Sequence, residues 1–187
     1  MLEGRVSDAE VFLSRVSADD APALFTALDH PEVGTYIGGR VADSPEAMRR
    51  LIERWVAGPT SDHGQEHWLN YVVRLGDGTT IGHAQATVNP SWAEVAWVIG
   101  TPWWGQGFGF ETATSLLREL ASGFSISTAW ATVDPDNVRC VGLLARLGFQ
   151  EVDVAAAPAL GSYDPGDLVY TRSLQSSRMV NPAGLRQ

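Results

Sequence analysis

Three glycines alternate with larger residues where one apolar stretch ends and another begins. The sequence from position 103 reads WWGQGFGFE, which contains Gly105, Gly107 and Gly109, and a run with helical spacing follows over 109–121. The first turn of a helix carries backbone N–H groups without partners and the positive end of the helix dipole. Without side chains in the way, a phosphate group can approach these N–H groups closely. This stretch is therefore a candidate anion-binding turn.

Two common phosphate-binding motifs do not fit this stretch. The P-loop ends in Gly-Lys-Ser or Gly-Lys-Thr, and the sequence contains no lysine. The dinucleotide-binding fingerprint has the spacing G-x-G-x-x-G, whereas the spacing here is G-x-G-x-G. The structural alternative is a tight turn whose glycines let a helix pack closely on a sheet.

Other residues that could do chemistry stand before and after the glycines. Glu94 opens the apolar run AEVAWVIG, where it is either a functional carboxylate or a solvent-facing strand charge. Downstream, in NVRCVGLLARLGF, Asn137 is a good helix N-cap and Gly148 a good residue to follow a helix, which would explain both structurally. Cys140 is the only cysteine, so it forms no internal disulfide, and a lone helical cysteine is more often a small buried apolar residue.

The elements that must position these residues follow from periodicity. Helices are predicted after the N-cap Ser17 and over 45–56, 109–121 and 137–149. Strands are predicted over 10–16, 68–75, 79–88, 93–100, 126–133, 150–156 and 167–174. The strand–helix–strand order over 94–133 implies a parallel pair with a crossover helix. The predicted fold class is α/β (α+β), with a central mixed, mostly antiparallel sheet of about seven strands flanked by about four helices.

Composition limits the function classes. The chain has 187 residues, which favours a single domain with its core over about 10–174 and a tail over 175–187. Its 13 basic residues, all arginine, face 22 acidic ones, giving a net charge of −9. This argues against nucleic-acid binding through a basic surface, and it either favours a cationic partner such as an amine or reflects solubility alone.

Location and metal binding are predicted from what the sequence lacks. No apolar run approaches the roughly 18 residues of a membrane span, and the N-terminus does not resemble a signal peptide, so we expect a cytoplasmic protein without a membrane partner. His30, His63 and His67 show no metal-ligand spacing, and no metal is expected. Strand periodicity does not decide which face of the sheet His83 occupies.

Taken together, these motifs resemble the GNAT superfamily of N-acetyltransferases. AEVAWVIGTPWWGQGFGFETA is similar to the acetyl-CoA-binding region of that family, whose Q/R-x-x-G-x-G/A motif lies between the fourth strand and the third helix, although Trp104 stands at the Gln/Arg position. DPDNVRCVGLLARLGFQEV resembles the P-x-N-x-x-S…L-G-F segment, with Cys140 replacing the serine. DAPALFTALDHPEVGTYIGG, followed by SPEAMRRLIERW, looks like the RimJ/RimL branch, which includes ribosomal-protein N-terminal acetyltransferases.

The resemblance implies a site between the parallel strands, which are splayed in this family. Backbone N–H groups near Val98 and Ile99 would polarise the thioester carbonyl. Glu94 would be the general base, a role that requires burial, and Cys140 would donate a proton to the leaving thiolate, because Leu144 stands where many relatives have a tyrosine. The residues implied to bind coenzyme A are Val98, Ile99, Trp104, Gly105, Gln106, Gly107, Phe108, Gly109, Phe110, Asn137 and Cys140.

The implied activity is transfer of acetyl from acetyl-CoA to a primary amine by direct attack. The acceptor, a protein N-terminal α-amine or a small-molecule amine such as a polyamine or an aminoglycoside-like compound, would contact residues 29–40 and 57–66. The alternative from another class is a non-catalytic coenzyme A sensor or assembly domain, which Cys140 and Leu144 favour. A domain that binds no coenzyme A, favoured by Trp104, is a third reading, and a homodimer is left open.

Overall fold

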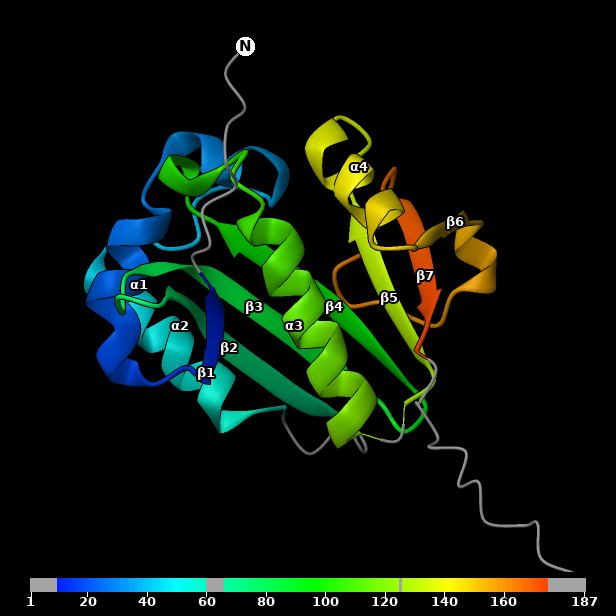
Figure 1. The fold of residues 1–187 in the computed structure, drawn as a ribbon, viewed down its shortest axis with the longest axis horizontal. Coiled ribbons are helices and arrows are strands. Elements are labelled where there is room, and N and C mark those ends of the chain that lie inside the picture. Colours follow the sequence, from blue (N-terminus) through cyan, green and yellow to red (C-terminus); the bar gives the residue numbers. More distant parts are fainter. Residues whose placement is uncertain (1–9, 60–65, 125, 175–187) are drawn as a thin grey trace, which may run out of the picture.

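The computed structural model describes residues 10–59, 66–124 and 126–174. One sheet has the strand order β1-β2-β3-β4-β5-β7-β6, and among these strands only β4 and β5 run parallel (Figure 1). This confirms the predicted mixed, mostly antiparallel sheet. The strands are β1 (Val11–Arg15), β2 (His67–Leu75), β3 (Thr80–Val88), β4 (Trp92–Ile99), β5 (Thr128–Val133), β6 (Gln150–Val152) and β7 (Leu168–Ser173).

Helices cover both faces of this sheet. The helix α3 (Phe108–Gly123) crosses the face that is in front in Figure 1, and α4 (Val138–Arg146) packs into the same core. The helices α1 (Ala21–Leu28) and α2 (Pro45–Ala57) form a second core on the opposite face. In the described part of the chain, no helix is both long and apolar enough to cross a membrane.

Short 3₁₀ turns account for the main differences from the predicted elements. Ser17 and Asp20 form the predicted capping box, but the chain first makes the turn η1 (Ala18–Asp20) before α1 begins. The last predicted helix ends at Arg146, and β6 ends at Val152 because Asp153 caps the turn η5 (Val154–Ala156). Two further turns are η2 (Pro31–Tyr36) and η4 (Thr101–Trp103).

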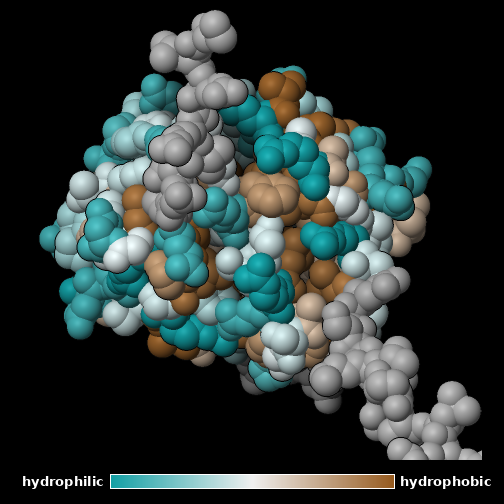
Figure 2. All heavy atoms as spheres, in the orientation of Figure 1, coloured by the Kyte–Doolittle hydropathy of each residue, from teal (hydrophilic) through white to brown (hydrophobic). Residues whose placement is uncertain are grey.

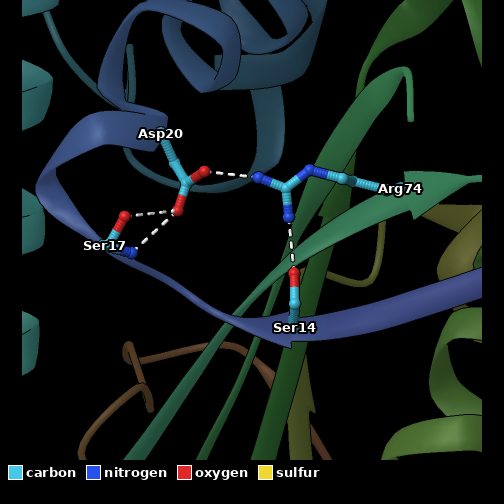
Figure 3. A network of polar contacts seen from close by, with 4 residues as sticks. All are labelled: Ser14, Ser17, Asp20 and Arg74. Carbon is cyan, nitrogen blue, oxygen red and sulfur yellow. Dashed lines mark hydrogen bonds and ion pairs between the residues drawn. The ribbon is translucent and has the colours of Figure 1, made fainter.

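A polar network fastens the edge strand β1 to the start of α1 (Figure 3). The guanidinium of Arg74 in β2 donates to the Ser14 hydroxyl of β1 and pairs with the Asp20 carboxylate. That carboxylate also accepts from the Ser17 backbone N–H at 2.7 Å. Because Arg74 and Asp20 are largely buried, the network holds the α1 end of the second core in place.

The parallel pair opens after three residues. Trp92, Ala93 and Glu94 of β4 pair with Thr128, Ala129 and Trp130 of β5. Beyond these residues the two strands no longer pair with each other, although β4 stays paired with β3 to Ile99 and β5 with β7 to Val133. We call the opening between 95–99 and 131–133 the parting. Figure 2 shows apolar residues exposed between α3 and β5, below α4. The sheet therefore offers a partly apolar opening at the centre of the fold.

Candidate functional site

A run of backbone donors lies at the N-terminus of α3. Gly105 and Gly107 have φ values of 74° and 93°, in the left-handed region that glycine adopts most easily, and Gly107 is the N-cap of α3. The N–H groups of Phe110 and Glu111 donate to the Gly107 carbonyl at 2.9 and 3.2 Å. The N–H groups of residues 105–109, which we call the cradle, have no acceptor among the described residues. They are available to an anion.

The space around the cradle distinguishes anion binding from close helix packing. A Cβ atom added at Gly105 or Gly107 would meet nothing within 4 Å, so no packing contact requires glycine there. At Gly109, in contrast, a Cβ atom would lie 3.3 Å from the Leu143 side chain of α4. Close packing therefore explains Gly109, whereas the open space at Gly105 and Gly107 fits a bound phosphate.

Side chains beside and within the cradle secure the turn. The Trp104 indole N–H donates to the Ile99 carbonyl at 2.6 Å, which ties the turn to the end of β4. Gln106 donates to the Pro102 carbonyl at 2.9 Å, and Phe108 is buried in the core under α3. These contacts hold the cradle at both ends without using its backbone N–H groups.

The register of β3 and β4 decides which N–H groups of β4 face the parting. Gly100 N–H donates to the Ile81 carbonyl and Asn89 N–H to the Trp92 carbonyl, which fixes the alternation of the antiparallel ladder. The backbone of Val98 is therefore directed at His83 in β3. The backbones of Trp97 and Ile99 are directed at the parting, where the Ile99 carbonyl accepts from Trp104.

Asn137 and Cys140 lie at the start of α4, on the same face of the sheet as the cradle. The Asn137 side chain accepts from the Cys140 N–H at 3.2 Å, so it is the N-cap. Burial raises the pKa of the Cys140 thiol to about 11. Leu144 is fully buried in the core. Nearby in the fold, burial and the neighbouring Glu151 carboxylate raise the pKa of the Tyr170 phenol.

Glu94 lies on the opposite face, with the side chains of Ala96 and Val98, because side chains alternate along β4. It is 8% exposed. One carboxylate oxygen accepts from the Gly161 N–H at 2.9 Å, and the other accepts from the Ser162 N–H at 3.0 Å and from the Ser162 hydroxyl. Thr132 of β5 donates to the Ser162 carbonyl at 3.1 Å. Glu94 therefore anchors the segment 157–167, which precedes β7, where β4 and β5 begin to part.

His83 lies on the opposite face of the sheet from α3. His83 faces the α1–α2 side of the sheet, where its ring stacks on Trp55 of α2 with centroids 4.2 Å apart. Burial lowers the His83 pKa to about 3, and its Nε2 has no partner among the described residues. His63 lies outside the described residues. Among those described, no group of three or more histidine, cysteine, aspartate or glutamate side chains could hold a metal ion.

Sequence reasoning missed Ser162, Thr132 and the Trp97 backbone. Ser162 lies in an exposed segment without periodicity, so no sequence signal connects it to Glu94, 68 residues away. The orientation of Trp97 could have been found once the register of β3 and β4 was known. Of the expected acceptor-contacting regions, 29–40 contains η2 with exposed Tyr36 and Ile37, and most of 57–66 lies outside the described residues.

Comparisons with known proteins agree with this arrangement. An uncharacterized N-acetyltransferase of Bacillus licheniformis is 25% identical over 141 residues, which are 74% of this chain and 78% of that protein. Spermidine N-acetyltransferase from Vibrio cholerae, solved with CoA and spermine, superposes with a TM-score of 0.70 at 16% identity, covering 89% of this chain and 97% of that one. An acetyl transferase from Salmonella typhimurium that modifies the N-terminal serine of ribosomal protein L7/L12 gives 0.70 at 17% identity, covering 91% and 98%.

The family model describes the chain more directly than any single relative. The model of the acetyltransferase (GNAT) domain matches residues 10–150, which include β1 through α4 together with the cradle and the parting. The chain therefore belongs to the GNAT acetyltransferase family.

Proposed function

We propose that the chain transfers an acetyl group from acetyl-CoA to a primary amine. The observation that carries this proposal is the run of N–H groups over 105–109, which have no acceptor within the described part of the chain and lie beside the parting of β4 and β5. Acetyl-CoA, when bound, would supply a thioester whose carbonyl carbon an amine attacks. The cradle would hold its pyrophosphate, with Trp104 at the start of the cradle and Asn137 at the N-terminus of α4 as the further residues expected to contact the ligand.

The backbone of β4 would polarise the thioester carbonyl. We assign this to the N–H groups of Trp97 and Ile99, which are directed at the parting, and not to that of Val98, which is directed at β3. Fixed backbone donors need little reorganisation during the reaction, which is the advantage of an oxyanion hole. Apolar surroundings at the parting would strengthen these hydrogen bonds.

Proton transfer places different demands on Glu94 and Cys140. A thiol of pKa about 11 is a weaker acid than a coenzyme A thiol near 8.5, so protonation of the leaving thiolate by Cys140 is uphill by about 3 kcal/mol. We therefore propose that solvent supplies this proton. Both oxygens of the Glu94 carboxylate already accept hydrogen bonds from Gly161 and Ser162. The general-base role expected for Glu94 therefore stays a prediction.

The acceptor is left as a primary amine. The spermidine and N-terminal serine enzymes of similar fold act on a polyamine and on a protein α-amine, and both are consistent with the net charge of −9. An α-amine is neutral at pH 7 far more often than a lysine-like amine, so it needs less help from a base. The RimJ/RimL assignment, the cytoplasmic location and the independence from metal also stay predictions.

One observation favours a second function. Leu144 is fully buried and Cys140 is a poor proton donor, so neither side chain of α4 suits acid catalysis. A domain that binds coenzyme A without transferring acetyl, acting as a sensor or an assembly module, would need neither. Turnover of any amine by the wild-type chain would refute this alternative.

The test measures binding first and turnover second. Coenzyme A and acetyl-CoA are titrated by calorimetry into the wild type and into Gly107→Val, and acetylation of a panel of peptides and amines is followed by mass spectrometry. Gly78→Val is the matched control, because Gly78 also has a left-handed φ (87°) and open space around it but lies in the turn between β2 and β3. We expect Gly107→Val to lose binding and Gly78→Val to keep it. Wild-type protein that binds neither ligand would overturn the proposal.

A further inference from the structure

Two arginines of α4 stand over the two residues that flank the cradle. The guanidinium carbon of Arg139 lies 5.1 Å from the centroid of the Trp104 ring, and that of Arg146 lies 4.9 Å from the Phe110 ring. Leu143, between them on the same face of α4, meets Gly109. This spacing of four and three residues brings the three side chains onto one face of the helix. The face runs alongside the cradle.

Neither arginine has an acidic partner among the residues that the structure describes. This is notable in a chain with 22 acidic residues, where Arg40, Arg49 and Arg74 do pair with aspartates. Arg139 and Arg146 contact aromatic rings instead, a contact that contributes about 0.5–1 kcal/mol at an exposed site. Both guanidinium groups therefore keep hydrogen-bond donors available for an anion.

Helix stability does not explain Arg139. It lies in the first turn of α4, where the helix dipole destabilises a cation by about 0.3–1 kcal/mol. Arg146 lies in the last turn, where the same dipole favours a cation, so helix stability is enough to explain an arginine at this position. Arg139 therefore occupies an unfavourable position in α4, and it contacts Trp104 next to N–H groups that have no acceptor among residues 10–59, 66–124 and 126–174. A bound anion would offset the cost of that position.

We propose that Arg139 and Arg146 form a charged second wall of the cradle and bind phosphate oxygens of coenzyme A. The inference rests on the proposed function and extends it from the backbone of α3 to side chains of α4. A guanidinium over an aromatic face does not spend its N–H donors on an acidic partner, and arginine can present two of these donors to the oxygens of one phosphate. Because the sequence contains no lysine, arginine is its only strongly basic side chain.

The phosphate could belong to the pyrophosphate or to the 3′-phosphate of the ribose. The experiment separates them by titrating coenzyme A and dephospho-CoA, which lacks the 3′-phosphate, into the wild type, Arg139→Gln and Arg146→Gln. Arg54→Gln is the matched control, because Arg54 is an exposed arginine in the last turn of α2, on the opposite face of the sheet. Circular dichroism and thermal unfolding check that each variant is folded.

We expect each α4 variant to bind coenzyme A at least about tenfold more weakly than the wild type, because each loses one charge-assisted hydrogen bond to the ligand. Arg54→Gln should bind coenzyme A like the wild type. Equal losses for both ligands assign the arginine to the pyrophosphate, and a loss for coenzyme A alone assigns it to the 3′-phosphate. Affinities within twofold of the wild type in both α4 variants would overturn the inference. Failure of the wild type to bind would instead overturn the proposed function.

Discussion

Replacing Glu94 tests whether this residue positions a segment or accepts a proton. Its two carboxylate oxygens receive two backbone N–H groups and one hydroxyl from Gly161 and Ser162. In Glu94→Gln, one oxygen becomes an NH2 group that faces a backbone N–H, so at least one donor loses its acceptor. In Glu94→Ala, all three lose it. Both variants should therefore release the segment 157–167 from the sheet.

The size of the effect follows from these bonds. A hydrogen bond to a charged group contributes about 1.5–3 kcal/mol, and Gly161 and Ser162 are exposed enough that water replaces part of what is lost. We take about 2 kcal/mol for Glu94→Gln and about 3 kcal/mol for Glu94→Ala. The first figure corresponds to roughly thirtyfold faster hydrogen exchange at the Gly161 and Ser162 amides. Because the segment can detach locally, the unfolding temperature should fall by less than the roughly 4–8 °C that a global loss of 2 kcal/mol implies.

Hydrogen exchange and the pH profile of kcat/KM together distinguish a positioning role of Glu94 from a general-base role. If Glu94 is a positioning residue, Glu94→Gln raises exchange over 157–167 and the KM for the amine, while the acidic limb of the kcat/KM profile stays. If it is the general base, that limb disappears. Unchanged exchange at Gly161 and Ser162 together with a lost acidic limb would refute the positioning role. Thr132→Val is a useful companion, because it removes a contact to Ser162 and leaves the carboxylate intact.

Three further outcomes are expected. Cys140→Ala should lower kcat less than about tenfold, because a thiol of pKa about 11 is a poor proton donor, and a loss above a hundredfold with unchanged coenzyme A binding would contradict this. His83 should lower the free energy of unfolding by about 1.6 kcal/mol between pH 6.5 and pH 5, because the imidazole is protonated in the unfolded chain but stays neutral in the folded one. Denaturant unfolding at both pH values should therefore show a smaller fall in His83→Phe than in the wild type. Asn137→Ala should cost about 1 kcal/mol of unfolding free energy through the lost N-cap, measured by urea unfolding with Ser44→Ala, the N-cap of α2, as a comparison.

Local patterns predicted the elements well because each element carries its own signal. Ser44 and Pro45 mark the start of α2, and alternation over 80–88 predicts a strand whether or not its neighbours are known. The cradle could also be predicted locally, because its glycines and the start of the helix lie within one short stretch of sequence. The 3₁₀ turn η1 was missed because Ser17 and Asp20 cap a tight turn as readily as an α-helix.

Features that depend on long-range contacts could not be predicted from the sequence. The direction of the Val98 backbone depends on its register with His83, and one residue of slippage would reverse it. The anchoring of Gly161 and Ser162 by Glu94 joins segments that have no sequence relationship. The contact of Arg139 with Trp104 depends on how α4 packs beside the cradle, and the local sequence around Arg139 carries no signal of it.

The opposite faces of the sheet limit how the reaction can proceed. The cradle, Asn137 and Cys140 lie on the α3 face, whereas Glu94 and the segment that it anchors lie on the other, so only the parting connects them. Cys140 is an unsuitable acyl carrier between the two faces, because the thiolate is the nucleophile and a pKa of about 11 leaves very little thiolate at neutral pH. No other cysteine is available. A thioester held from one face and an amine arriving from the other would have to meet in the parting itself, beside the N–H groups of Trp97 and Ile99, which is the geometry of direct attack.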